Sequence, residues 1–211
     1  LFSSSIDNGI SWSAPAALNN DAFTDVNADT NPRVATNGTL WVTVWSDGPN
    51  VSAATSPTGL DWGNPIDLGT GTEPGVAVDA GGDSVAVAEN AGNIIAIHPA
   101  AAGGATNTVG PGANPDVGVD NLAANNWLAA FESGADIGVA VSAAGEVWGA
   151  TVIVDSPGAA AAGPRVGFDP LTGNWFVFWA SDDTNIYFSF SADSGAIWSA
   201  AAVVGGDAIF P

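Results

Sequence analysis

Short runs in which apolar and polar residues alternate, separated by turns of Gly, Asn and Asp, fill most of this chain. In the clearest case, runs at 32–36 and 40–45 flank the dipeptide Asn37-Gly38. Asn-Gly between two such runs is the strongest short-range signal for a β-hairpin. No segment has the 3.6-residue period of a capped helix, and the alanine stretch 159–162, between Pro-Gly and Gly-Pro, predicts a loop. The pattern therefore predicts an all-β fold.

The hairpin pattern occurs four times, and each copy opens with a proline. The prolines are 42, 41 and 49 residues apart, at Pro32, Pro74, Pro115 and Pro164. A second hairpin separates successive copies, so each repeat holds four short antiparallel strands, which is typical of the blades of a β-propeller. We expect a single β-propeller domain over 1–211, with repeat units at about 1–31, 32–73, 74–114, 115–163 and 164–211.

The first repeat unit is incomplete. Residues 1–18 predict only the third and fourth strands of a blade, at 2–5 and 12–18, joined by a turn at 7–9. Residues 207–211 resemble the approach to another first strand. The sequence thus predicts four complete blades and a partial fifth, whose missing strands we expect to follow residue 211 in a larger propeller.

A second motif, Ser-x-Asp-x-Gly-x-x-Trp, marks the turn between the third and fourth strands of a unit. It is complete near both ends of the chain, as Ser5, Asp7, Gly9 and Trp12 and as Ser191, Asp193, Gly195 and Trp198. Two reduced copies lack the turn Asp but keep Gly59 with Trp62 and Gly145 with Trp148. The carboxylate accepts hydrogen bonds from nearby main-chain N–H groups, and Gly adopts a positive φ without steric cost. The Trp is expected at the start of the next strand, where it caps an apolar layer.

These turns, with the hairpins between them, resemble the Asp-box or BNR repeats of the sialidase-like family. The resemblance is close at 5–15 and 191–201 and partial at 55–65 and 141–150. It implies a propeller whose Asp boxes are structural and peripheral, so Asp7 and Asp193 are expected to form turns rather than to act in catalysis or metal binding. It also implies a secreted or cell-surface protein. Asp boxes occur in sialidases, other glycoside hydrolases and non-catalytic propellers, so the resemblance leaves the function open.

Charge and composition exclude several functions. The sequence has 22 acidic residues and two cations, Arg33 and Arg165, for a net charge of −20. Nucleic acids and anionic membrane surfaces are bound by clustered Lys and Arg, which this sequence does not offer. The lack of Cys excludes disulfides, thiol catalysis and thiolate metal sites. No apolar run reaches the length of a membrane span, and a signal peptide is expected only upstream of residue 1.

The likeness to sialidases can be tested residue by residue. In that family three arginines hold the substrate carboxylate, beside a Tyr–Glu pair and an acid/base Asp, whereas this chain has two arginines and one tyrosine, Tyr187. Arg33 and Arg165 stand at equivalent positions directly after the unit proline, where the other units have Gly75 and Asp116. The arginine triad cannot be built. The sequence therefore predicts no catalytic residues and favours a protein that is not an enzyme.

Four residues are candidates for ligand binding. Arg33 and Arg165 qualify because a guanidinium binds a carboxylate through two hydrogen bonds, with simple relics of the repeat as the alternative. Glu89 and Glu132 qualify because each ends the second strand of an inner hairpin after apolar residues, with solvated strand ends as the alternative. Alternating tryptophans on two second strands predict packing between blades, with stacking on sugar rings as the alternative, at Trp41, Trp45, Trp175 and Trp179.

No metal site is predicted, and Ca²⁺ is the one cofactor that the sequence leaves open. Loop oxygens at 25–29 and 182–183 suit a hard cation but match no standard calcium loop. His98 is the only histidine, which argues against a histidine metal site and a Ser–His triad, and its position before Pro99 predicts a strand end.

The sequence therefore favours a non-catalytic extracellular propeller that acts as a scaffold or binds a glycan or a protein. Two alternatives stay open. One is a part of a sialidase-like glycoside hydrolase whose remaining catalytic residues lie outside this chain. The other is a structural filament or envelope component.

Overall fold

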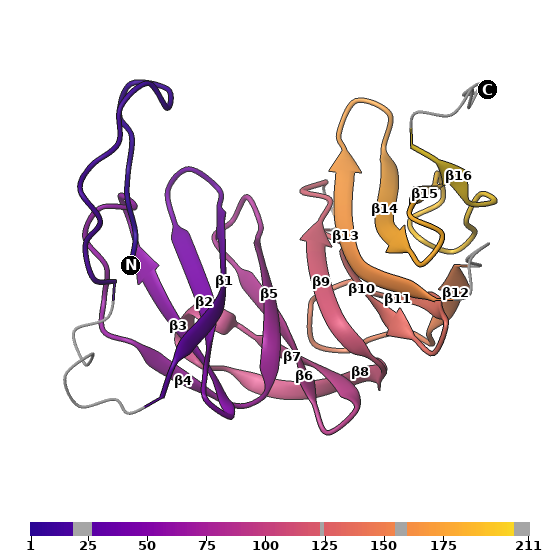
Figure 1. The fold of residues 1–211 in the computed structure, drawn as a ribbon, viewed down its shortest axis with the longest axis horizontal. Coiled ribbons are helices and arrows are strands. Elements are labelled where there is room, and N and C mark those ends of the chain that lie inside the picture. Colours follow the sequence, from indigo (N-terminus) through magenta and orange to yellow (C-terminus); the bar gives the residue numbers. More distant parts are fainter. Residues whose placement is uncertain (19–26, 123–124, 155–159, 205–211) are drawn as a thin grey trace.

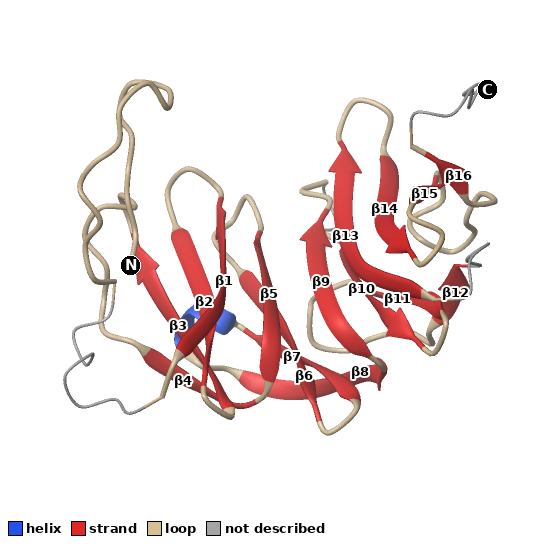
Figure 2. Cartoon of the chain, in the orientation of Figure 1, coloured by secondary structure: helices blue, strands red, loops and turns tan. Residues whose placement is uncertain are grey.

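The computed structural model describes residues 1–18, 27–122, 125–154 and 160–204, and nearly all of its regular structure is β-strand (Figures 1 and 2). The strands form four antiparallel sheets of four strands each. Within each sheet the strands lie in chain order, as in a meander. Each sheet is one blade of a β-propeller, and the predicted all-β fold with four complete blades is confirmed.

The blades are numbered in chain order. Blade 1 contains β1 (Asp29–Thr36), β2 (Trp41–Asp47), β3 (Asn50–Ser56) and β4 (Ile66–Thr70). Blade 2 contains β5 (Thr72–Val78), β6 (Ser84–Asn90), β7 (Asn93–His98) and β8 (Ala105–Pro111), with the short 3-10 helix η1 (Ala100–Ala102) before β8. Blade 3 contains β9 (Ala113–Val119), β10 (Trp127–Ser133), β11 (Asp136–Ser142) and β12 (Val152–Val154). Blade 4 contains β13 (Ala161–Asp169), β14 (Asn174–Ser181), β15 (Ile186–Ser191) and β16 (Ala202–Val203).

The four blades follow one another in an arc, from blade 1 beside the N-terminal hairpin to blade 4 near the C-terminus (Figure 1). The first strands of consecutive blades pack against one another, β1 with β5, β5 with β9 and β9 with β13. They form the inner layer of the arc, and the other strands of each blade lie progressively farther out. Residues at equivalent positions of the first strands are therefore brought together.

Consecutive blades stack face to face on apolar side chains. We call the face that a blade turns to the preceding blade its leading face, and the opposite face its trailing face. Leu128 and Ala130 on the trailing face of blade 3 pack in one buried cluster with Trp175 and Trp179 on the leading face of blade 4. Neighbouring residues of a strand point to opposite faces, so the second strand of a blade can contact the preceding blade with one face and the following blade with the other. The predicted packing of tryptophans between blades is confirmed for Trp175 and Trp179.

Every first strand carries a β-bulge directly before its proline. The bulge residues have φ values of 52°, 52°, 47° and 59°, at Asn31, Glu73, Asn114 and Gly163. The register with the second strand shifts at each of these points. Proline has no N–H, so it fits a position where the strand has left the regular ladder.

The bulge also explains why the predicted loop at 159–162 is wrong in part. Residue 159 lies outside the described residues, but Ala161 and Ala162 are the first two residues of β13. The pair Gly163-Pro164 forms a bulge inside the strand and does not end it. For the same reason Arg33 and Arg165 lie inside their strands and not at the first position.

Residues 1–18 fold back on themselves as the N-terminal hairpin, beside blade 1 (Figure 1). The predicted strands at 2–5 and 12–18 are reduced to a single bridge between Phe2 and Ala16, so this part of the prediction is wrong. The physical reason is that a two-stranded ribbon without inner strands is only marginally stable. Its position is that of the outer half of a further blade.

The trailing face of blade 4 is apolar. It carries four phenylalanines whose neighbouring ring centroids are 6.3, 6.1 and 5.8 Å apart, namely Phe176, Phe178, Phe188 and Phe190. The Phe178 side chain is 38% exposed and that of Ile186 is 48% exposed. In the part of the chain that the structure describes, no helix is long and apolar enough to cross a membrane.

Candidate functional site

The two complete Asp boxes form closed hydrogen-bonded turns. In the C-terminal box, the Ser191 hydroxyl donates to Asp193 Oδ1 at 2.7 Å, and the main-chain N–H of Ile197 donates to the same oxygen at 2.8 Å. The Gly195 N–H donates to Ser191 Oγ at 3.0 Å. The Ile197 N–H and the Ser191 hydroxyl lower the pKa of Asp193. The carboxylate is therefore held inside its own turn.

The N-terminal box has the same arrangement. The Ser11 hydroxyl donates to Asp7 Oδ2 at 2.6 Å and the Ser11 N–H to Oδ1 at 2.9 Å. Together with Ser5, these donors lower the pKa of Asp7 to about 2. In the reduced copy at Gly59, Ser56 Oγ accepts the Gly59 N–H at 2.8 Å, and Thr58 Oγ1 accepts the Leu60 N–H at 3.2 Å in place of an Asp carboxylate.

The tryptophans of the boxes do not begin the next strand, which corrects the sequence prediction. Strands β4, β12 and β16 start four residues after Trp62, Trp148 and Trp198 respectively. The residue after each tryptophan already donates its N–H to the third strand, as Gly63 does to Thr55 O at 2.8 Å, but the regular ladder begins only three residues later. Trp12 is 65% exposed. Trp148 and Trp198 pack against the buried core clusters, which confirms the predicted capping of an apolar layer for these two. Trp198 also donates its indole N–H to Gly195 O at 3.1 Å within its own box.

The inner layer gathers three charged residues from equivalent positions of the first strands. Asp116 of β9 accepts the main-chain N–H of Val166 in β13 at 2.9 Å. Burial raises the pKa of Asp116, although the Val166 N–H and the positive charges of Arg165 and Arg33 act in the opposite direction. Both cations of the chain therefore act electrostatically on one partly buried carboxylate, although among the described residues neither forms an ion pair with it.

Blade 2 contributes a glycine to the same position. A Cβ atom on Gly75 would lie 3.2 Å from the Asp116 Cα and 3.3 Å from Asp116 Oδ1. Such contacts are tighter than most real Cβ contacts, so the close approach of β5 and β9 favours glycine here. The four units together place Arg, Gly, Asp and Arg along the inner layer. The signal for Asp116 was present in the sequence, because it follows its unit proline as the arginines do.

Each guanidinium is oriented by its own strand. Arg33 donates to Pro32 O at 3.1 Å, and Arg165 donates to Pro164 O at 2.6 Å. An arginine side chain has five N–H donors, so several on each side chain remain available to a ligand. The bulge before each proline thus sets the orientation of the arginine after it.

The two candidate glutamates lie elsewhere in the blades. Glu132 Oε1 accepts the side-chain amide of Asn114 and the main-chain N–H of Gly163, both at 2.8 Å, and so ties the bulges of blades 3 and 4 together. The Asn31 amide donates to Glu73 Oε1 at 2.8 Å between blades 1 and 2 in a related way. Glu89 is partly buried near the end of β6. Among the described residues, no ion pair joins Glu89 or Glu132 to either arginine.

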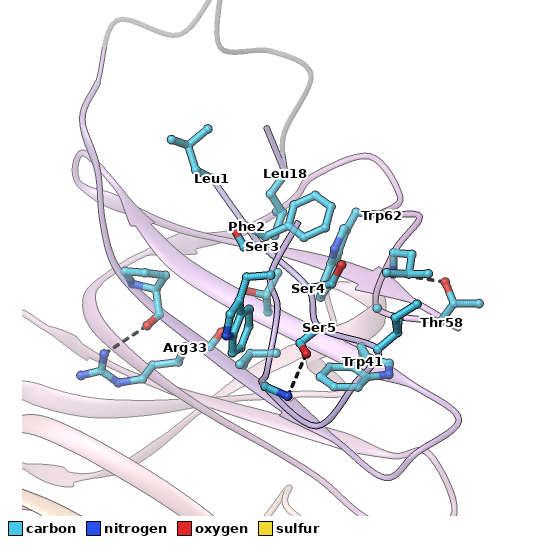
Figure 3. Close-up of a pocket in the computed structure, with 18 residues that line it drawn as sticks. Leu1, Phe2, Ser3, Ser4, Ser5, Leu18, Arg33, Trp41, Thr58 and Trp62 are labelled. Atoms are coloured by element: carbon cyan, nitrogen blue, oxygen red, sulfur yellow. Dashed lines mark hydrogen bonds between the residues drawn. The ribbon is translucent and has the colours of Figure 1, made fainter. Parts of the chain in front are cut away.

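A groove that the sequence did not predict lies between the N-terminal hairpin and blade 1, and we call it the hairpin groove (Figure 3). Its volume is about 670 Å³, and its lining includes four aromatic side chains, Phe2, Trp12, Trp41 and Trp62. The rings of Phe2 and Trp62 meet edge to face with centroids 6.1 Å apart. Arg33 lies on one side of the groove and Trp62 on the other (Figure 3).

Within the described residues, no group of three or more His, Asp or Glu side chains is arranged to hold an ion. Of the loops considered from the sequence, residues 25 and 26 lie outside the described residues. In the other, Asp183 accepts the Tyr187 hydroxyl at 2.7 Å, which lowers the pKa of Asp183.

His98 ends β7, as predicted, and its ring lies between two acids. Nε2 is 2.7 Å from Asp83 Oδ2, and Nδ1 is 3.6 Å from Glu146 Oε1. Asp83 belongs to blade 2 and Glu146 to the reduced box of blade 3, so the contact joins two blades. Sequence reasoning missed it because the three residues are far apart in the chain.

Comparison with solved structures places the fold among sialidase-like β-propellers. The NanB sialidase from Streptococcus pneumoniae is similar with a TM-score of 0.64 and 10% identity, covering 87% of this chain and 52% of that protein. An exo-β-1,3-galactanase from Phanerochaete chrysosporium is similar with a TM-score of 0.60 and 13% identity, covering 89% and 52%. A Nidogen/Laminin complex contains a chain with a TM-score of 0.52 and 15% identity, covering 82% and 64%.

These likenesses define the fold and not the activity. The chain spans about half the length of the sialidase and the galactanase that it matches. No family model matches the chain, and no curated protein matches it either.

Proposed function

We propose that this protein is a non-catalytic propeller that binds a glycan on its inner layer, between Arg33 and Arg165. The proposal rests on the positions of the two positive charges. A chain with 22 acidic residues places both of its cations at equivalent points of the inner strands, where the charge of each favours the ionised form of Asp116. An acidic ligand would meet attraction here and repulsion over most of the remaining surface.

The side chains suit a sugar. Guanidinium N–H groups donate to carboxylate and hydroxyl oxygens, and the Asp116 carboxylate accepts from hydroxyl groups. Gly75 leaves the neighbouring position without a side chain. The fold neighbours support the same ligand class, since two of them are a sialidase and a galactanase.

A role without catalysis agrees with the chemistry of the inner layer. Glu132, a candidate for ligand binding, accepts hydrogen bonds from Asn114 and Gly163 and so connects two blades. Burial raises the pKa of Asp116, and its Oδ2 accepts the Val166 N–H, so this carboxylate is also engaged in a contact between two blades. The proposed protein acts outside the cell, at its surface or in secreted form, where glycans are displayed.

The proposal is tested by calorimetric titration with an acidic oligosaccharide, 3′-sialyllactose, and a neutral one, β-1,3-galactotriose. Arg33→Gln and Arg165→Gln each remove a charged donor, and we expect a loss of affinity of about 10- to 150-fold for each, since charge-assisted hydrogen bonds contribute about 1.5–3 kcal/mol. Val147→Ala, at an exposed position in the box of blade 3, is the control and should bind normally. Unchanged binding in both arginine variants, or no binding by the parent chain, contradicts the proposal. Turnover of a fluorogenic sialoside would favour the glycoside hydrolase instead.

A further inference from the structure

We propose that His98 and Glu146 bind a divalent transition-metal ion such as Zn²⁺ between blades 2 and 3. His98 ends the third strand of blade 2, and Glu146 lies in the turn between the third and fourth strands of blade 3. An ion held by both residues would link the two blades away from the inner layer. The site does not depend on glycan binding.

Asp83 fixes the orientation and the protonation of the imidazole ring. Its Oδ2 lies 2.7 Å from His98 Nε2, and its Oδ1 accepts the main-chain N–H of Ser84 at 2.8 Å. An ionised carboxylate only accepts hydrogen bonds, so Nε2 carries the proton and Nδ1 of the neutral ring keeps a lone pair. A carboxylate that holds one ring nitrogen while the other binds a metal is the usual arrangement around a metal-bound histidine.

His98 Nδ1 is buried and has no hydrogen-bond partner among the described residues. The His98 side chain as a whole is only 10% exposed, and the nearest acid is Glu146, whose Oε1 lies 3.6 Å from Nδ1. A buried acceptor without a donor is costly, and a neighbouring carboxylate supplies no donor. A cation between the two atoms would satisfy both. The Glu146 side chain is 64% exposed and can move to admit one.

The distance between the two atoms suits a shared ion better than a direct hydrogen bond. An N–H···O bond is about 2.7–3.2 Å long, shorter than the 3.6 Å found here. Zinc binds nitrogen at about 2.0–2.1 Å and carboxylate oxygen at about 2.0–2.2 Å, so a tetrahedral ion separates two such ligands by about 3.4 Å. The two side chains therefore need to move little to bind Zn²⁺.

The turn of blade 3 is held against the imidazole by close packing. Gly145 has a φ of 74°, and a Cβ atom there would lie 3.0 Å from His98 Cδ2. Glycine thus lets the turn approach the ring closely and brings the Glu146 side chain to the ring nitrogen.

The ligands also indicate the kind of ion. Imidazole suits Zn²⁺, Cu²⁺ and Ni²⁺, whereas Ca²⁺ and Mg²⁺ prefer oxygen ligands alone. The described residues bring no third His, Asp or Glu ligand to this position. Water would complete the coordination, and binding should be weaker than at a structural zinc site with four protein ligands. The net charge of −20 favours the approach of cations.

NMR of the ¹⁵N-labelled chain tests the proposal directly. His98 is the only histidine, so both imidazole nitrogen resonances belong to it. Spectra are recorded above the pH range in which histidines ordinarily titrate. We expect Nε2 to be protonated and Nδ1 not, and titration with zinc chloride to shift the Nδ1 resonance while Nε2 stays protonated. Magnesium chloride should leave the Nδ1 resonance unchanged.

Four variants separate this site from general attraction to an acidic surface, with zinc affinity measured by calorimetry. His98→Gln keeps a side-chain N–H for Asp83 but removes the Nδ1 ligand, so binding should be lost. Asp83→Asn should weaken binding about tenfold, as expected for a residue that orients a metal ligand. Glu146→Gln removes a ligand itself and should weaken binding further. Asp61→Asn, at an exposed acid in the reduced box of blade 1, removes the same charge and should bind like the parent chain.

Thermal unfolding gives a second measurement, because an ion that binds only the folded chain raises the melting temperature. Zinc chloride should raise it for the parent chain and for Asp61→Asn but not for His98→Gln. An Nδ1 resonance that zinc does not move, or equal zinc affinity of the parent chain and His98→Gln, overturns the proposal. Should His98→Gln fail to fold, the resonances of the parent chain decide the question. Normal zinc binding by Arg33→Gln would show that this site and the glycan site are separate.

Discussion

The contact between blades 3 and 4 depends on the absence of a side chain at Gly118. A Cβ atom there would lie 2.8 Å from Val166 Cγ1 and 3.2 Å from Trp175 Cζ3. Trp175 is 1% exposed and has little room to move, so Val166 and β13 would have to shift. We expect Gly118→Ala to lower the free energy of unfolding by about 1–3 kcal/mol, the range for overpacking a filled core.

The repeat supplies a matched control for this substitution. Gly167 has the same position in β13, but its Cβ would meet nothing within 4 Å because it belongs to the trailing face of blade 4. Gly167→Ala should therefore be neutral or stabilising by up to about 1 kcal/mol, as expected when only the unfolded chain loses freedom. Urea unfolding followed by tryptophan fluorescence measures the free energy of unfolding of both variants. In thermal unfolding, each kcal/mol of change should move the melting temperature by about 2–4 °C.

A double variant tests the assigned cause. Val166→Ala removes the methyl group that a Cβ at Gly118 would strike, so the combination should recover part of the loss, with a coupling of about 1 kcal/mol. The reasoning is refuted if Gly118→Ala and Gly167→Ala change stability equally, or if the effects of Gly118→Ala and Val166→Ala simply add.

Two carboxylates give further predictions. Burial raises the pKa of Asp116, so its contribution to stability is largest below the ordinary value of 3.8 and is lost as the pH rises through the folded-state pKa. Asp116→Asn should thus be more stable than the parent chain at pH 7 and lose this advantage towards pH 3, and urea midpoints showing the opposite trend would contradict this. The pKa of Asp193 is lowered, so its contribution is present above 3.8 and disappears as the pH falls through the lower folded value. At pH 7, Asp193→Ala should speed hydrogen exchange at Ile197, whereas Asp61→Ala in the reduced box should leave that amide unchanged.

Local patterns were enough to predict the blades. Asn37-Gly38 and the regularly spaced prolines located the inner hairpins, because turn chemistry and strand alternation are properties of adjacent residues. The bulge at Gly163 was misread as a loop, since a Gly-Pro pair is compatible with both and only the pairing with β14 decides. The N-terminal strands were overestimated, because the sequence of residues 1–18 does not show that the ribbon lacks inner partners.

The functional candidates were predictable in identity but not in arrangement. Arg33 and Arg165 were found from their place after the unit prolines. Their nearness to Asp116 depends on how neighbouring blades stack, which no local pattern reports. Glu132 looked like a solvated or ligand-binding acid, and its role as a tie between two bulges appears only when Asn114 and Gly163 are in place around it.

The ends of the blade row also have a consequence for behaviour in concentrated solution. Blade 4, which carries the phenylalanine face, lies at one end of the row, and the N-terminal hairpin, which contains the exposed residues Leu1, Ile6 and Ile10, lies at the other (Figure 1). Two different apolar surfaces at opposite ends of one molecule favour head-to-tail association. Such heterologous contacts form open filaments when the rotation between successive molecules does not close a ring. The charge of −20 opposes such growth over a range of about 8 Å at physiological ionic strength. We therefore expect mutual repulsion to keep the molecules apart in solution, and strong salt or acid to weaken that repulsion.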